Sequence, residues 1–424
     1  MTEGTQPRMA RGAKLTAGLL AAALFALLAF APFASAAPDP VASGTATVTL
    51  KNGFVKSLKK QKVKVTKLAP ARLKGKKATF SVTGGEMDPI SGAGTLNLSG
   101  GLKFKAGKKT VKVKALVVNT AKKSLYAKIG GRKLRFAAIA GWSFARAGFG
   151  VSLTIKKLKL TNAAAKQLNK KLGFKKGKKP FKGNRLMARA VAEEQPATVT
   201  LVPANNVVFD ANADLLKKLK EVKAEVETIA PTTQKGLTTF EFPISGGNIA
   251  PAATAGVVQT IGGVKLFQKL PKSATENLET TITLGNFYVD LSAHTVSVEV
   301  VAASNASDKL NLGALGRSSI ADLNLTGATV TTDPVNRKVT VQNAAATLQP
   351  VSAEVLNGFV QVYKAWIEGV TTLKTCEALP GKCAEPAEKE FAAAKGKEAG
   401  EAAAKNEIHS GDPLGTFSFT AQTQ

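Results

Sequence analysis

The sequence predicts a mainly β protein with two tandem antiparallel β-sandwich or open-barrel domains, short helices and a helical insertion in the second domain. Two observations lead to this class. Apolar and polar residues alternate with a period of two in segments such as 111–115 and 295–300, which is typical of strands with one buried face. In addition, a framework of glycines occurs twice with a constant offset, as Gly84, Gly85, Gly94, Gly100 and Gly101, and then as Gly246, Gly247, Gly256, Gly262 and Gly263. We interpret these glycines as structural turn and bulge positions.

The first segment predicts export. Three basic residues precede an apolar run from Leu15 to Phe30, which ends at Pro32 and an Ala34-Ser35-Ala36 pattern. This order is typical of a signal peptide over residues 1–36, cleaved near Ala36. The alternative is an uncleaved membrane anchor, but the run is at the short end for spanning and contains a proline at its end. We therefore expect a secreted or cell-surface protein.

The mature chain, about 390 residues, is long enough for two domains that each bury a core. We expect a first domain at 45–190 and a second at 197–424. Each copy is expected to open with a similar strand, 46–50 and 197–201, and residues 160–165 are expected to correspond to 341–346. Short helices are expected at 162–171 and 213–229, and the segment up to Phe54 is expected to continue the first strand.

The second copy contains an insertion at about 360–410. Its flanks, 355–373 and 385–405, are rich in Ala, Glu and Lys with apolar residues at helical spacing. The two cysteines of the chain, Cys376 and Cys383, lie between these flanks. In an oxidising compartment this spacing favours a structural disulfide, and redox or zinc Cys-x-x-Cys spacing is absent. We expect a helical hairpin held by that disulfide.

Charge is divided unequally between the copies. The formal net charge is +30, yet Glu86 and Asp88 are the only acids between Lys51 and Arg189. Such a field attracts polyanions and weakens with salt. The expected partners are anionic cell-envelope polymers or lipid headgroups, or another surface protein. Lysine dominates over arginine and aromatics are few, which argues against sequence-specific nucleic-acid binding. The alternative is a solvated surface kept for solubility.

The sequence lacks the parts of common catalytic sites. It has two histidines, His294 and His409, and no His-Glu-x-x-His or Gly-x-Ser-x-Gly motif. Glu86 and Asp88 could form a catalytic carboxylate pair, but salt bridges are the more ordinary role for two acids in a basic domain. We therefore expect that the protein is not an enzyme and that it binds no metal and no obligatory cofactor.

The strand around 47–54, the Phe80 to Gly85 and Gly94 to Phe104 segments and the later 160–164 stretch together resemble the HtaA-domain family. The resemblance covers both copies apart from the insertion. It implies an exported surface protein of the actinobacterial type, often in tandem copies, whose better-known members bind haem and pass it to an importer.

Where that family binds haem, the resemblance implies an iron-ligating tyrosine shortly after the first strand's phenylalanine and a neighbouring histidine. The residues after Phe54 contain no tyrosine, and neither does the 203–210 stretch of the second copy. The remaining candidates are Tyr288 and His294, which a hairpin would place on neighbouring strands. The leading hypothesis is therefore a non-catalytic envelope-binding protein whose cationic first domain adheres to anionic material, and the alternative is a haem-binding protein of the uptake type.

Overall fold

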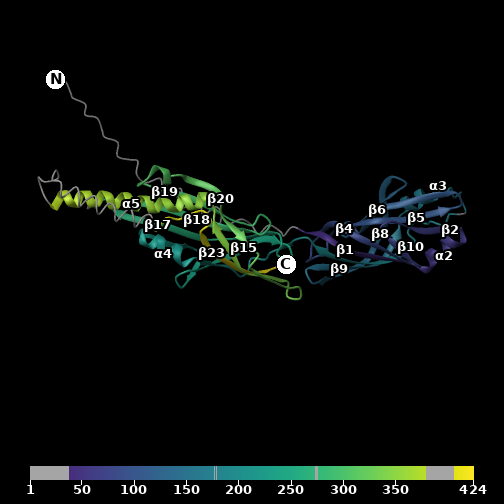
Figure 1. Cartoon of the computed structure of the whole chain (residues 1–424). Coiled ribbons are helices and arrows are strands. Elements are labelled where there is room, and N and C mark those ends of the chain that lie inside the picture. The colour runs from purple at the N-terminus through teal and green to yellow at the C-terminus, as the bar shows by residue number, and fades with distance from the viewer. Residues whose placement is uncertain (1–37, 176, 178, 273–275, 379–404) are drawn as a thin grey trace, which may run out of the picture. The chain divides into compact units, whose positions relative to one another are not determined.

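A computed structural model describes residues 38–175, 177, 179–272, 276–378 and 405–424; of 369–378 it describes the backbone alone. The expected signal peptide and the second half of the insertion, with Cys383 and hence the expected disulfide, lie outside the described residues. Within them the protein is mainly β, and its strands form two antiparallel sheets with similar topology (Figure 1).

The first sheet closes into an eight-stranded barrel. Strands β5 to β10 follow one another, β1 and β4 continue the order, and β4 pairs with β5 to complete the ring. Strands β2 and β3 extend this first barrel at its side. The strands are β1 (Asp39–Leu50), β2 (Val63–Leu68), β3 (Arg72–Lys74), β4 (Lys77–Met87), β5 (Gly94–Ala106), β6 (Lys109–Asn119), β7 (Ser124–Ile129), β8 (Arg132–Ala147), β9 (Gly150–Leu160) and β10 (Leu186–Pro196).

The second sheet repeats this ring. The order β15-β12-β23-β22-β20-β19-β18 is closed through β16, which pairs with both β18 and β15. The strands of this second barrel and its additions are β11 (Val199–Thr200), β12 (Asn206–Ala211), β13 (Ala224–Ile229), β14 (Thr233–Lys235), β15 (Thr239–Ile249), β16 (Gly256–Thr260), β17 (Gly263–Pro271), β18 (Asn277–Asp290), β19 (Thr295–Ser304), β20 (Gly313–Asn324), β21 (Thr329–Asp333), β22 (Lys338–Leu348) and β23 (Pro413–Gln422).

The repeated glycines lie where two strands approach most closely. Gly85 in β4 and Gly247 in β15 both have positive φ, 126° and 118°. A Cβ atom on Gly85 would collide with the carbonyl oxygen of Thr95, and one on Gly247 would collide with that of Val257. Only glycine fits these positions. The framework therefore marks equivalent strand crossings in the two barrels.

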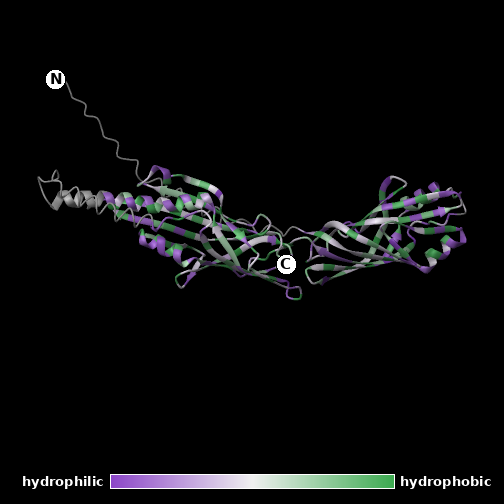
Figure 2. Ribbon diagram, in the orientation of Figure 1, coloured by the Kyte–Doolittle hydropathy of each residue, from purple (hydrophilic) through white to green (hydrophobic). Residues whose placement is uncertain are grey.

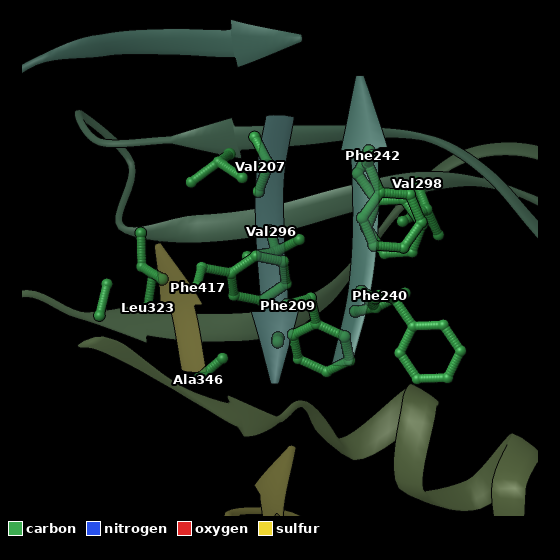
Figure 3. Packing of buried hydrophobic residues seen from close by; sticks show 14 of the residues in the cluster. Val207, Phe209, Phe240, Phe242, Val296, Val298, Leu323, Ala346 and Phe417 are labelled. Atoms are coloured by element: carbon green, nitrogen blue, oxygen red, sulfur yellow. The ribbon is translucent and has the colours of Figure 1, made fainter. Parts of the chain in front are cut away.

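Each barrel has its own apolar core. Hydrophobic and hydrophilic residues alternate along the strands (Figure 2), and the hydrophobic ones face inward. In the first barrel Phe54 and Phe104 both pack edge to face on Phe181, with ring centroids 6.2 and 5.5 Å apart. In the second barrel the ring of Phe209 stacks on those of Phe417 and Phe240, at 4.6 and 6.4 Å (Figure 3). Large aromatic rings bury more apolar surface than aliphatic side chains do, so these contacts contribute strongly to each core.

Among the described residues there are four α-helices, α2 (Asn52–Lys60), α3 (Asn162–Leu172), α4 (Ala213–Glu221) and α5 (Pro350–Ala378), and one short 3-10 helix, η1 (Asp308–Leu310). The prediction of α3 is confirmed; Thr161 caps it by accepting a hydrogen bond from the Ala164 N–H. Two predictions were wrong. Strand β1 ends at Leu50 and α2 follows, and the helix expected at 213–229 ends at Glu221 before strand β13.

The repeat also aligns differently from the sequence expectation. Helix α4 follows β12 as α2 follows β1, so residues 46–50 correspond to 207–211 and not to 197–201. Helices α3 and α5 each follow a long strand, so Leu160 corresponds to Leu348 and the expected match of 160–165 with 341–346 was wrong. Alanine-rich sequence had suggested a false register.

Helix α5 is the start of the predicted insertion. It begins at Pro350, and in Figure 1 it lies beside β17 and β20. The Trp366 Nε1–H donates to the carbonyl of Pro271 at 2.7 Å, and Asn357 exchanges two hydrogen bonds with the backbone of Ile408. Cys376 falls within the last turns of this helix.

Candidate functional site: a lysine ladder on the first barrel

The basic residues of the first barrel occupy the outward positions of its strands. In β6 the buried residues Val111 and Val113 alternate with the exposed Lys112 and Lys114. The same alternation places Lys103 and Lys105 outward on β5, around the buried Phe104. Because side chains of a strand alternate between faces, each strand contributes its lysines to one surface.

Strand register places these lysines opposite one another. Lys103 lies directly opposite Lys112 across the β5–β6 pair, and Lys64 lies opposite Lys105 across β2–β5. Farther along the sheet, Lys114 lies opposite Lys128. Lys128 in turn lies opposite Lys133 across β7–β8. Directly opposed side chains have Cβ atoms about 5 Å apart, and like charges there destabilise a sheet.

We call this set the lysine ladder. It extends across five adjacent strands in the order β2-β5-β6-β7-β8, and its members are Lys64, Lys103, Lys105, Lys112, Lys114, Lys128 and Lys133. At a strand spacing of about 4.8 Å, five strands present a cationic surface about 19 Å wide.

The second barrel carries charge pairs at the equivalent place. Lys265, which corresponds to Lys103, forms an ion pair of 2.6 Å with Glu227, its cross-strand neighbour. Its ammonium also lies 4.8 Å from the ring centre of Phe267. Four residues further along β17, Lys269 pairs with Glu279 at 3.2 Å. In the first barrel Thr66 stands where Glu227 stands in the second.

Among the described residues, the ladder lysines have no carboxylate partner. Within the described ranges, no Lys or Arg of the first barrel lies within 4.0 Å of an acidic side chain, and the ion pairs found there belong to the second barrel. Seven close, unneutralised ammonium groups produce a strong positive potential over this face. The arrangement suits a ligand that carries several negative charges in a row.

Glu86 and Asp88, the two acids considered as a catalytic pair, do not form one in the structure. Burial opposes ionisation of Asp88, but hydrogen bonds from Ser91 and from the Ile90 N–H outweigh it and lower the pKa of this carboxyl. Asp88 thus closes a turn after β4. Glu86 lies exposed on the strand itself.

Tyr288 and His294 lie on the hairpin expected from the sequence, formed by β18 and β19. Tyr288 pairs with Ser297, three residues beyond His294, which places the two about 10 Å apart along the hairpin. The Arg317 guanidinium lies 3.3 Å from the ring centre of Tyr288, while His294 is exposed in the turn. This arrangement does not fit a shared haem iron.

The stretch equivalent to Phe54–Leu58 in the second barrel is 215–219 in α4, because α2 and α4 occupy the same place in the fold. It reads Leu-Leu-Lys-Lys-Leu and contains neither tyrosine nor histidine. The expected iron-ligating tyrosine is therefore missing from both copies at the structurally equivalent positions. The loss of a phenolate would remove the main axial bond to ferric iron.

Sequence reasoning found the charge of the first domain but missed the ladder. The signal was present in the Val-Lys-Val-Lys run of 111–114 and the Lys-Phe-Lys of 103–105, both with lysine on the polar face. What was missing is the register, since a slip of one residue would move each lysine to the other face.

Other features of the described residues add little chemistry. No group of three or more His, Cys, Asp or Glu side chains gathers there as metal ligands. Over the same ranges, no helix is long and apolar enough to cross a membrane.

Comparison with known proteins identifies one family. A sequence model of the HtaA family (Htaa) matches residues 220–365. Among solved structures, the crystal structure of the C-terminal domain of HtaA from Corynebacterium glutamicum matches with 13% identity and a TM-score of 0.29, covering 37% of this chain and 98% of that chain. No curated protein matches the sequence.

Proposed function

Residues 220–365 of this chain form an HtaA domain, and from that premise we propose an exported, non-catalytic binding protein of the cell envelope whose first barrel adheres to an anionic envelope polymer. HtaA domains belong to a family of surface binding proteins associated with haem uptake. The lysine ladder carries the proposal, because it adds to this binding fold a surface that the second barrel lacks.

The physical argument rests on the stability that the sheet loses when lysines oppose one another. Opposed lysines such as Lys103 and Lys112 destabilise a sheet, by up to about 1 kcal/mol for each pair. In the second barrel Thr283 stands at the place of Lys112, and Lys265 pairs with Glu227 on its other side, so this surface accepts an arrangement without opposed lysines. A surface kept only for solubility does not require lysines directly opposite each other, since the same number of lysines could be placed at positions that do not face one another. A polyanion that bridges the ladder converts the repulsion into attraction.

A matched pair of variants tests this proposal. Lys103→Gln/Lys112→Gln removes two ladder charges, and Lys265→Gln/Lys269→Gln removes two charges from the second barrel. Both variants have the same net charge. We expect the first to lower retention on isolated cell walls about 10- to 30-fold, at about 1 kcal/mol per lysine, and the second to leave it nearly unchanged.

Equal losses of retention in both variants would show that retention depends only on the net charge of the protein, and would overturn a specific role of the lysine ladder. Anionic lipid vesicles run beside the cell walls distinguish the ligand's source. Binding to vesicles but not to lipid-extracted walls would assign the ladder to lipid headgroups and overturn the polymer proposal.

Haem binding is the second candidate, favoured by the HtaA domain at 220–365. The positions of Tyr288 and His294 argue against them as ligands. A hemin titration of the mature protein decides between the two functions. A saturable, salt-resistant Soret shift near one haem per chain supports haem uptake, whereas no shift, or one abolished by salt, supports the envelope-binding proposal. If a shift occurs, Tyr288→Phe and His294→Ala test those two residues directly.

A further inference from the structure

The interior of the second barrel contains an apolar cavity of about 130 Å³. Its walls come from the barrel strands and from helices α4 and α5, with Leu215, Leu266, Ile320 and Leu356 among them. Among the described residues, serines are the only polar ones that line it, and no charged, tyrosine or histidine side chain does. The corresponding cavity in the first barrel measures about 40 Å³.

The difference follows from where each barrel keeps its large aromatic residues. Phe54 and Phe104 of the first barrel correspond to Leu215 and Leu266 of the second, on α2/α4 and on β5/β17. Phe136 corresponds to Ile320, because each precedes an alanine whose strand partner lies two positions before the following helix. Three phenylalanines are thus replaced by smaller aliphatic residues.

The second barrel places its aromatic rings elsewhere. Phe209, Phe240 and Phe417 stand at the positions of Val48, Ala78 and Ala190, and Phe209 and Phe240 form part of the cavity wall. The stack is visible in Figure 3. In the second barrel the large rings therefore stand on β12, β15 and β23, and smaller side chains stand on α4, β17 and β20. The cavity is the space that these smaller side chains leave.

The cavity has an apolar opening. Leu315 and Val351 both line it, yet 44% of the one and 64% of the other remain exposed. Large aliphatic side chains at the rim continue the apolar wall from the interior to the solvent. An apolar cavity of about 150 Å³ accepts a molecule of the size of benzene. This one therefore accommodates one end of a longer apolar molecule, whose remainder extends past the rim.

We propose that the second barrel binds the end of a single aliphatic chain, as in a fatty acid or an acyl lipid, with the polar headgroup outside. The chain fits because the wall offers almost no hydrogen-bond partner and its occupant loses none on entry. Leu216 also lines the cavity, and Lys220 lies one turn further along α4 on the same side of the helix. We expect its positive charge to favour an anionic headgroup. The proposal does not depend on the lysine ladder.

The test uses the full mature chain and a twelve-carbon fatty acid with a photoreactive diazirine at its terminal carbon. After irradiation and peptide mapping, we expect saturable labelling of lining segments of the second barrel and none of the first barrel's interior. Excess lauric acid should compete for the label. Label spread equally over both barrels, or no saturation, would overturn the proposal.

A filled cavity provides the matched variant. Leu266→Phe/Ile320→Phe installs the side chains that the first barrel holds at these positions, so the fold has a precedent for them. We expect at least a tenfold loss of labelling, with the thermal midpoint retained. Phe104→Leu/Phe136→Ile, the reverse exchange in the first barrel, should leave labelling of the second barrel unchanged.

Val351→Glu keeps the test decisive if the filled variant unfolds, because the side chain of this rim residue is largely exposed and tolerates a charge there. We expect it to weaken labelling several-fold, and unchanged labelling would contradict the proposed entry. Competition by hemin at equimolar concentration would assign the cavity to haem and overturn the aliphatic ligand. Unchanged labelling in the Lys103→Gln/Lys112→Gln variant separates this inference from the proposed function.

Discussion

Lys103 and Lys112 lie directly opposite each other on neighbouring strands of the first barrel, whereas Lys265, at the place of Lys103 in the second barrel, pairs with Glu227 at 2.6 Å. Two copies of one fold thus treat the same surface in opposite ways. The first barrel accumulates unbalanced positive charge there, and the second neutralises it.

Lys112→Glu should stabilise the first barrel while it weakens polymer binding. The substitution turns a repulsive cross-strand pair with Lys103 into an attractive one, worth about 0.2–1 kcal/mol at low salt. Denaturant unfolding at low and high salt measures the gain, which should shrink as salt screens the charges. A variant that is less stable at low salt would show that Lys112 is not opposed as the register indicates.

The framework glycines should tolerate no side chain in either barrel. Gly85→Ala and Gly247→Ala each force a Cβ into a carbonyl oxygen of the adjacent strand and impose a positive φ on alanine. We expect a loss of more than about 2 kcal/mol for each. Gly107→Ala, at a turn where a Cβ has open space, is the control and should cost less. Equal, small effects at all three would remove the framework's structural role.

Glu194 makes the first barrel's stability depend on pH. Burial raises the pKa of this carboxyl to about 7, with the hydrogen bond from Val151, nearby Asp39 and Arg146 as smaller influences. Its Oε2 has no hydrogen-bond partner among the described residues. In the unfolded chain the carboxyl titrates at about 4.5. Between these values the folded state holds a proton that the unfolded state has released.

Stability should therefore fall as pH rises from about 4.5 to about 7, by up to about 3 kcal/mol, and then level off. Glu194→Gln removes the titration, so the variant should match the wild type near pH 4.5 and exceed it at pH 8. Unfolding midpoints measured across this range check the difference. A wild-type midpoint that rises with pH in the same window, relative to the variant, would contradict the buried, raised carboxyl.

The aromatic stack should dominate the second core. Phe417 is fully buried and its ring lies 4.6 Å from that of Phe209. Phe417→Ala leaves a void and should cost about 3–5 kcal/mol. Differential scanning calorimetry measures the loss. Ala190→Val, at the equivalent position of the first barrel, adds two methyl-sized groups beside the small cavity that Ala190 lines and should change stability far less.

Much of the fold could be predicted because its signals are local. Period-two alternation predicted strands, and the constant offset from Gly84 to Gly246 and onward predicted two copies of one unit. The first and last segments of each copy were harder to match from the sequence. The alanine-rich 341–346 segment resembles 160–165 in letters, but it lies in strand β22, since tertiary pairing outweighs the helix propensity of alanine.

The candidate site was predictable only in part. Composition predicted a cationic first domain, but the opposition of Lys103 to Lys112 depends on the β5–β6 register, which no local pattern determines. The interior cavity was beyond sequence reasoning. The exchange of Phe104 for Leu266 is conspicuous only after the two barrels are aligned by their strands.

The most direct test of the central claim compares two double variants of equal net charge on isolated, lipid-extracted cell walls over a range of salt concentrations. Lys103→Gln/Lys112→Gln should lose most of the retention at low salt and show a shallower salt dependence than the wild type, while Lys265→Gln/Lys269→Gln behaves as the wild type does. Retention that is indifferent to salt, or equal in the two variants, would contradict binding through the lysine ladder.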